Sequence, residues 1–215
     1  MMKSLVIAAG LWIAASGVAA AQEPLQSEQA QLIERLEELN TLQANFVQLV
    51  KDANGDLVQQ LQGAMVLKRP NKLIWQTDAP DETLLVANGE TLWYHNAFIE
   101  QVTIYDQAEA VAQSPLLLLL DAENNDWQNY DVAIQTDAGE HSYTITPKDS
   151  AQNISSLTLR FAEGAILSRI TLDDGQGQVS EISLSEQVLN ERVSDLRFDY
   201  EVPANIDVDD QRTRN

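Results

Sequence analysis

The residues with the most distinctive chemical character form a short run at a predicted turn. Lys68-Arg69-Pro70-Asn71 places two cationic side chains next to a Pro-Asn pair, which is typical of a turn, and apolar strand-like segments lie on both sides. The chain has 13 Lys and Arg against 33 Asp and Glu, so cations are scarce. Arg69 is either a solvated turn residue or, because a guanidinium carries several N–H donors, a residue that binds several carbonyl oxygens together.

Residues for enzymatic chemistry are weakly indicated. The chain has two histidines, His95 and His141, no cysteine, and neither a G-x-S-x-G nor an H-E-x-x-H motif. Carboxylates are abundant, so a paired-acid glycosidase stays open, but their spacing distinguishes no pair. Asp173-Asp174 and Asp209-Asp210 are more typical of solvated turns than of a cation site. We predict no catalytic residue, no metal and no cofactor.

One amphipathic helix is expected before the first strand. Leu32, Leu36 and Leu39 recur with helical spacing, and Ser27 is a candidate N-cap for a helix over 28–40. From Leu42 onward the period of the apolar residues changes to two, which is typical of strands.

The remaining chain predicts a curved antiparallel sheet. Turn signals such as Asn54-Gly55 and Asn88-Gly89 separate short alternating runs. About eleven or twelve such strands favour a mainly β fold, a meandering antiparallel sheet that curls into a barrel or a half-open one. The runs are 42–46, 57–67, 73–76, 83–87, 91–95, 99–105, 127–135, 141–146, 157–161, 166–172, 179–184 and 196–200.

The alternation stops between Asp106 and Asp126. There, Ser114 and Pro115 are a typical helix start, and the five leucines that follow, 116–120, make every face of the predicted helix apolar. This helix either plugs the open side of the sheet or forms a lid over an apolar cavity. A lid in a ligand-free protein is also a plug, so the two interpretations are compatible.

The N-terminus and the composition indicate export. Residues 1–21 combine Lys3, an apolar run too short to span a membrane and three closing alanines, as in a cleaved signal peptide. Residues 22–215 are then expected to form a single domain with twelve Lys and Arg against 33 Asp and Glu, a formal charge of −21. This charge argues against nucleic acid as a partner. Without cysteine the chain has neither disulfides nor a site for lipoprotein-type acylation, so we expect a soluble exported protein.

Several motifs together resemble one family, the periplasmic outer-membrane lipoprotein carriers (LolA). The resemblance covers most of the chain after the predicted signal peptide. It is carried by 44–48 (ANFVQ), 68–75 (KRPNKLIW), 81–96 (DETLLVANGETLWYHN), 98–101 (FIEQ), 126–130 (DWQNY) and the ending 198–212.

The resemblance implies a fold and a set of site residues. The family folds as an incomplete barrel covered by helices that enclose the acyl chains of a lipoprotein, so 28–40 and 107–120 would form the lid. Arg69 would be the lid latch, the residue that holds the lid closed in the empty protein. Leu73 stands where the family often has an aromatic residue at the mouth. Candidates for the acyl cavity and lid are Phe46, Leu61, Met65, Leu73, Trp75, Leu85, Trp93, Phe98, Ile99, Leu116, Leu117, Leu118, Leu119 and Leu120.

The resemblance also implies partners and a location. The cargo would be acylated lipoproteins, the donor an inner-membrane lipoprotein-releasing ABC transporter (LolCDE-like) and the acceptor an outer-membrane lipoprotein receptor (LolB-like). We expect a monomeric periplasmic chaperone for lipoprotein transport, not an enzyme. Two alternatives stay open on the residues alone: a small outer-membrane β-barrel, and an exported lipid or glycan hydrolase.

Overall fold

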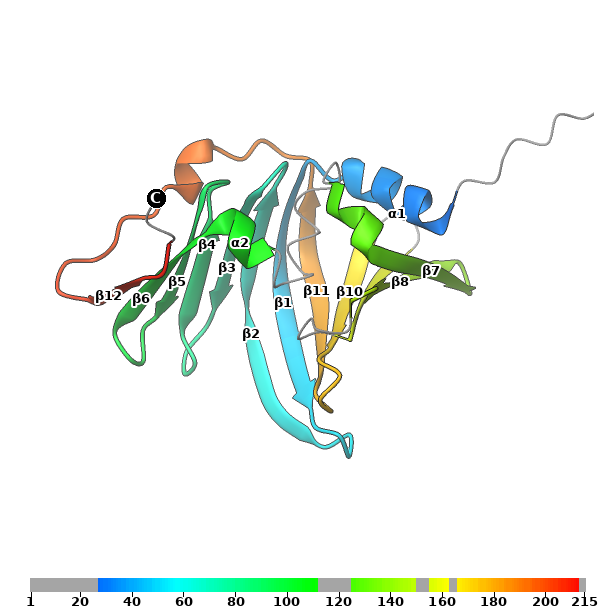
Figure 1. The fold of residues 1–215 in the computed structure, drawn as a ribbon, viewed down its shortest axis with the longest axis horizontal. Helices are drawn as coiled ribbons and strands as arrows, with labels where there is room; N and C mark the ends of the chain where they lie inside the picture. Colours follow the sequence, from blue (N-terminus) through cyan, green and yellow to red (C-terminus); the bar gives the residue numbers. More distant parts are fainter. Residues whose placement is uncertain (1–26, 112–124, 150–154, 163–165, 213–215) are drawn as a thin grey trace, which may run out of the picture.

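A single curved sheet forms the framework of the molecule. The computed structural model describes residues 27–111, 125–149, 155–162 and 166–212. Twelve strands lie within these ranges, in the order β12-β6-β5-β4-β3-β2-β1-β11-β10-β9-β8-β7 (Figure 1). The bounds are β1 Thr41–Lys51, β2 Leu57–Lys68, β3 Lys72–Thr77, β4 Thr83–Ala87, β5 Thr91–Asn96, β6 Gln101–Asp106, β7 Tyr130–Asp137, β8 Glu140–Pro147, β9 Ser156–Ala162, β10 Ile166–Asp173, β11 Val179–Leu189 and β12 Asp207–Asp210.

Two antiparallel meanders share this sheet. Strands β1 to β6 follow one another in space as in sequence, as do β7 to β11, and β1 pairs with β11 to join them. The two end strands, β7 and β12, do not pair with each other, so the sheet is open, and the predicted half-open, mainly β fold is confirmed. One detail differs from the prediction: β12 lies parallel to β6. This orientation follows from the long connection after β11, which carries the chain back before it joins the edge.

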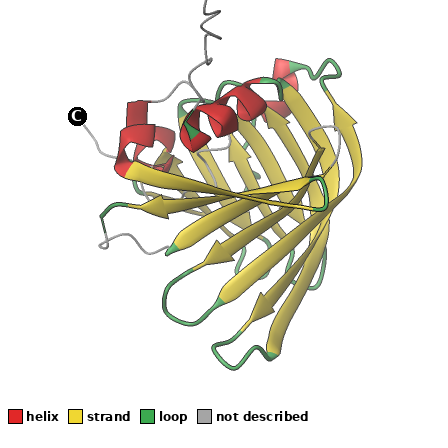
Figure 2. Cartoon of the chain, turned by 90° about the vertical axis from the view of Figure 1, so that its right-hand side faces the viewer, coloured by secondary structure: helices red, strands yellow, loops and turns green. Residues whose placement is uncertain are grey.

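The curvature has local causes at the centre of the sheet. The pairing of β1 with β11 shifts between Gln43 and Asn45, and Glu186 opposite this irregularity has a φ of 50°. Such a bulge bends a strand and increases its twist. Gly63 in β2 allows a second close approach, because a Cβ there would meet the backbone oxygen of Gln76 and the Phe46 ring. The sheet therefore has a concave inner face and a convex outer face (Figure 2).

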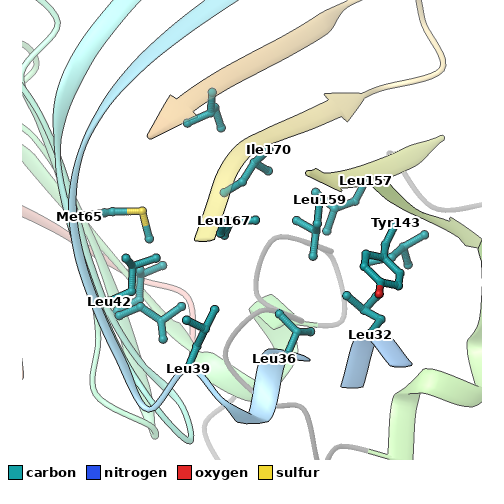
Figure 3. Close-up of a cluster of buried hydrophobic side chains, with 14 of the residues drawn as sticks. Leu32, Leu36, Leu39, Leu42, Met65, Tyr143, Leu157, Leu159, Leu167 and Ile170 are labelled. Atoms are coloured by element: carbon teal, nitrogen blue, oxygen red, sulfur yellow. The ribbon is translucent and has the colours of Figure 1, made fainter. Parts of the chain in front are cut away.

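The inner face is apolar along nearly its whole width. Its buried side chains point toward one another and toward helix α1 (Glu28–Glu37) in Figure 3. Ser27 caps this helix, since its hydroxyl accepts a hydrogen bond from the Ala30 amide at 3.2 Å, as expected from the sequence. The buried inner-face residues are Leu42, Ala44, Phe46, Met65, Leu67, Leu73, Ala87, Leu92, Tyr130, Tyr143, Ile145, Leu157, Leu159, Phe161, Leu167, Ile170 and Ile182; α1 adds Leu32 and Leu36, and the turn after it adds Leu39.

A second, smaller cluster covers part of the outer face. Val193 and Phe198 pack against Val66, with Ile74 beside them. Residues 196–200, predicted as a strand, are not one: a short 3₁₀ helix, η3, spans Asp195–Phe198. The alternating Leu196, Phe198 and Tyr200 imitate a strand, but the Ser194 hydroxyl accepts from the Leu196 amide at 3.4 Å and starts a helical turn.

Other boundaries differ by a few residues. Helix α1 ends at Glu37, short of the predicted residue 40, and Trp127 lies in the 3₁₀ helix η2 (Asn125–Asn129) before β7 begins. Helix α2 occupies Gln107–Val111, the start of the predicted lid. The predicted signal peptide, 1–21, and the five leucines of 116–120 lie outside the described residues. None of the helices in the described part of the chain combines the length and the apolar character needed to cross a bilayer.

Candidate functional site

Arg69 lies in a turn that contacts both the segment after α1 and the start of α2. It stands in the turn between β2 and β3, and its backbone amide donates to the Asn40 carbonyl oxygen at 2.9 Å, just after α1. The turn between β4 and β5, around Gly89, lies at the same end of the sheet, since the ideal Cβ position of Gly89 is 2.7 Å from Asn71 Oδ1. We call this end of the sheet the Arg69 end.

Gln107, the first residue of the predicted lid, connects the lid to the Arg69 turn. The residue is 3% exposed, its Nε2 donates to the Asn71 carbonyl at 2.7 Å, and its Oε1 accepts from the Gly89 amide at 2.8 Å. Its own amide donates to the Glu90 carbonyl oxygen at 2.9 Å. Sequence reasoning missed this residue, because a glutamine at the end of an alternating run carries no signal of burial.

The two lysines next to the Arg69 turn bind the outer-face segment. Lys68 Nζ and Lys72 Nζ donate to the same Asp195 Oδ1, at 2.8 and 2.7 Å, and Lys68 also donates to the Val193 carbonyl at 2.9 Å. Hydrogen bonds from Lys68 and Lys72 lower the pKa of the exposed Asp195 carboxyl to about 2. The cations around the turn are therefore partly structural, and Asp195 is a second residue that sequence reasoning did not find.

Six of the predicted cavity residues lie on the inner face. Phe46, Met65 and Leu73 are buried, and Leu61, Trp75 and Leu85 are partly buried. The Phe46 and Trp75 rings stack with their centroids 4.2 Å apart. Because apolar side chains offer no hydrogen bonds, this surface suits a hydrocarbon ligand.

Three of the predicted cavity residues are not on this face, and the prediction is wrong for them. Trp93 points to the outer face, because its register partners Val86 and Ile104 do, and it packs against the Tyr200 ring at 5.9 Å. Leu92, Trp93 and Tyr94 are all apolar or aromatic, so the sequence period did not define a face. Phe98 and Ile99 lie in the connection between β5 and β6 and are 85% and 56% exposed.

Arg35 lies against the inner face, and sequence reasoning missed it too. In the last turn of α1, its Nε donates to the Tyr143 hydroxyl at 3.3 Å, and its guanidinium carbon is 5.5 Å from the centre of the Phe161 ring. A signal existed: Arg35 is three residues after Leu32 and four before Leu39, so helical spacing places a cation beside the apolar stripe.

The two histidines are not brought together. His95 is on the outer face, 6.3 Å from the Tyr200 ring, and His141 at the start of β8 bonds to Thr136. Within the described residues no three His, Asp or Glu side chains gather as metal ligands do. The largest apolar feature of this part of the chain is the buried cluster on the concave inner face, with α1 packed against it and α2 starting beside the Arg69 turn.

An open sheet with an apolar inner face covered by helices is the architecture of a carrier for hydrophobic ligands. The chain belongs to the outer membrane lipoprotein carrier protein LolA family, whose model matches residues 37–201.

Individual relatives agree with this family. The chain is 41% identical to an outer-membrane lipoprotein carrier protein of Idiomarina loihiensis over 208 residues, which is 97% of this chain and 96% of that protein. It is 36% identical to one of Shewanella pealeana over 182 residues, covering 84% and 85% of the two chains. A crystal structure of an uncharacterized conserved protein from Thermus thermophilus shares the fold, with a TM-score of 0.53 at 12% identity over 85% of this chain and 99% of that one.

Proposed function

We propose that this protein is a periplasmic carrier that accepts acylated lipoproteins released from the inner membrane, shields their acyl chains and delivers them to an outer-membrane receptor. The observation that carries the proposal is the inner face, where one continuous apolar cluster extends from β5 to β7 beneath a helix. Membership of the carrier family supports the same role. The alternatives of an outer-membrane barrel or an exported hydrolase gain no support from that family, and we propose no enzymatic activity.

The size of the hydrophobic effect explains why a cavity is needed. Burial stabilises each methylene by about 0.8 kcal/mol, so exposing one long acyl chain to water costs on the order of 10 kcal/mol. An acylated protein therefore needs a cover to cross an aqueous gap. The cover must also release the chain, so the empty closed state has to be stable enough to compete with the loaded state. Helices that fill the hollow in the empty protein meet this requirement.

Arg69 is proposed as the latch of that closed state. Its turn bonds to Asn40 behind α1 and, through Gln107, to the start of α2. The guanidinium therefore lies near the end of α1 and the start of α2. Each charge-assisted hydrogen bond from it to a lid carbonyl is worth about 1.5–3 kcal/mol. Opening for cargo would break these bonds, and their recovery would help to expel it.

The Arg69→Leu variant tests the latch. We expect it to fold and to accept lipoprotein but to release it poorly, because the empty closed state loses its bonds. The measurement is transfer from the isolated carrier–lipoprotein complex to the receptor. Arg169→Leu, which removes an exposed arginine from the outer face of β10, is the matched control. Normal transfer by Arg69→Leu would contradict the latch.

The remaining parts of the proposal concern processing and partners. We propose that 1–21 are a signal peptide and that 22–215 form one monomeric domain, a view supported by the single sheet that contains all the described strands. An inner-membrane ABC transporter of the LolCDE kind is the proposed donor, and a LolB-like receptor is the acceptor. The mouth contact of Leu73 and the lid role of 116–120 are parts of the same proposal.

The decisive experiment uses spheroplasts that display an acylated lipoprotein on their inner membrane. Purified mature protein is added to the medium, and the supernatant is assayed for a stoichiometric complex of carrier and lipoprotein. We expect release that depends on ATP inside the cells. No release from spheroplasts that respond to another carrier would overturn the proposed function.

A further inference from the structure

Arg35 is a cation placed against a hydrocarbon surface. The helix that carries it is otherwise divided, with Leu32 and Leu36 buried and its glutamates exposed. Within the described residues, the polar and ring contacts of the guanidinium are the Tyr143 hydroxyl and the Phe161 ring alone. No carboxylate of the described part of the chain pairs with Arg35, although acidic residues are abundant.

These contacts hold the guanidinium in place and, within the described residues, use only its Nε–H donor. The Nε–H is used by the hydroxyl of Tyr143, which is 1% exposed. The Phe161 ring offers a cation–π contact at 5.5 Å, which compensates part of the lost hydration. The N–H groups of the two Nη atoms have no acceptor among the described residues. A group that binds there must supply oxygen acceptors next to apolar surface.

The position of Arg35 fits the end of an acyl chain that is joined to the cargo. α1 leads into β1 at the Arg69 end, and Tyr143 and Phe161 lie near the same end of β8 and β9, because His141 at the start of β8 pairs with Phe161. Figure 3 shows Tyr143 beside Leu32 of α1, with Leu157 and Leu159 further along the inner face. Acyl chains that lie along this face, with the cargo polypeptide outside, would have their linkage to the cargo beside Arg35.

We infer that Arg35 binds the carbonyl oxygens of the ester and amide linkages that join the acyl chains to the cargo. This inference rests on the proposed function and adds a polar recognition site to the apolar hollow. Tyr143 keeps the guanidinium against the wall in the empty protein. On loading, the Nη donors bond to the carbonyl oxygens, which would otherwise be buried without donors.

A pair of synthetic lipopeptides tests the inference. Both carry an S-glyceryl cysteine with two octanoyl-length chains, short enough to stay dispersed, attached through esters in one and through ethers in the other. Binding to the full mature protein is measured by calorimetry. We expect the ester form to bind about tenfold more tightly, as one charge-assisted hydrogen bond would give. Arg35→Met should remove this preference, and the exposed-site control Arg169→Met should keep it.

The alternative, a purely structural role for Arg35, gives a different result. Arg35→Met would then weaken both lipopeptides by the same factor, and the inference would be overturned. Arg35→Lys, which keeps the charge but loses the planar fork, should retain part of the ester preference in a folded protein. Equal binding of both lipopeptides by the wild type would overturn the inference and leave the proposed function standing. Binding of neither would overturn both.

A third ligand identifies the source of the carbonyl groups. Phosphatidylcholine with the same two octanoyl esters is added to the preformed complex with the ester lipopeptide. We expect little displacement at equal concentrations, because the cargo also contributes its cysteine backbone. Full displacement would overturn the assignment of this site to the cargo.

Discussion

At the residue scale, Gln107 tests how the lid is attached. Replacing it with alanine leaves the Gly89 amide and the Asn71 carbonyl without their buried partner, so we expect a loss of about 1–3 kcal/mol in the free energy of unfolding. Urea unfolding measures it. Gln60→Ala, on an exposed position of β2, should change stability little. A loss equal to that of Gln60→Ala would show that the hydrogen bonds of the Gln107 side chain make no net contribution to stability.

Asp195 gives a prediction for pH dependence. Its pKa is about 2 in the folded protein and is near 3.9 in an unfolded chain, so its contribution to stability is complete above about pH 5. As pH falls toward 2 the carboxylate protonates, and the contribution disappears. The difference in melting temperature between wild type and Asp195→Asn should therefore shrink over this range. Asp199→Asn, an exposed neighbour, is the control. A difference that is constant from pH 7 to 2.5 would contradict the ion-pair explanation.

Sequence patterns identified some of these residues and not others. The Arg69 turn was predictable, because Pro-Asn between apolar runs has a local signature. Arg35 was detectable from its spacing to Leu32, since helical period alone puts it beside the apolar stripe. Gln107 and Asp195 were not, because their partners lie 36 residues away at Asn71 and 127 residues away at Lys68. Only the folded chain brings those groups together.

At the scale of elements, the contact of β1, β2 and β3 depends on a glycine. Gly63 lies opposite Phe46, and a Cβ there would come within 2.9 Å of the Phe46 ring and meet the Gln76 backbone. We expect Gly63→Ala to cost about 1–3 kcal/mol by overpacking and to displace Phe46 from Trp75. Tryptophan fluorescence and urea unfolding measure both effects. Ala64→Val on the adjacent exposed position is the control. Equal changes in fluorescence and stability in the two variants would contradict the steric argument.

The same scale explains which strands were predictable. Where one parity is clearly apolar, as in β9 with Leu157, Leu159 and Phe161, the inner face followed from the sequence. In β5 both parities are apolar, because the outer face has its own cover, and Trp93 was placed on the wrong side. The alternating residues of η3, which forms this cover, predict a strand. The 3₁₀ turn that forms instead depends on a single cap and on packing against residues far away in the sequence.

At the scale of the whole molecule, charge and sheet edges act together. The open edge at β12 carries Asp207, Asp209 and Asp210, and acidic side chains oppose pairing with a second copy. We expect the mature protein to sediment as a monomer at neutral pH across micromolar concentrations. A dimer would contradict this prediction. The same measurement at higher salt is the control for long-range repulsion, because salt screens the net charge but leaves the edge carboxylates ionised.

The pairing of β1 with β11 also governs when the molecule can fold. Asn40 bonds to Asn190, 150 residues further along the chain, and neighbouring pairs join Leu42 to Leu189. A chain that emerges from a membrane pore with its N-terminus first would hold β1 to β6 for most of the passage, with one side of β1 unpaired. Long-range pairing of this kind slows folding and exposes apolar strands in the meantime. If the chain is exported as proposed, a protein that shields the hydrophobic chains of others would itself need protection during export.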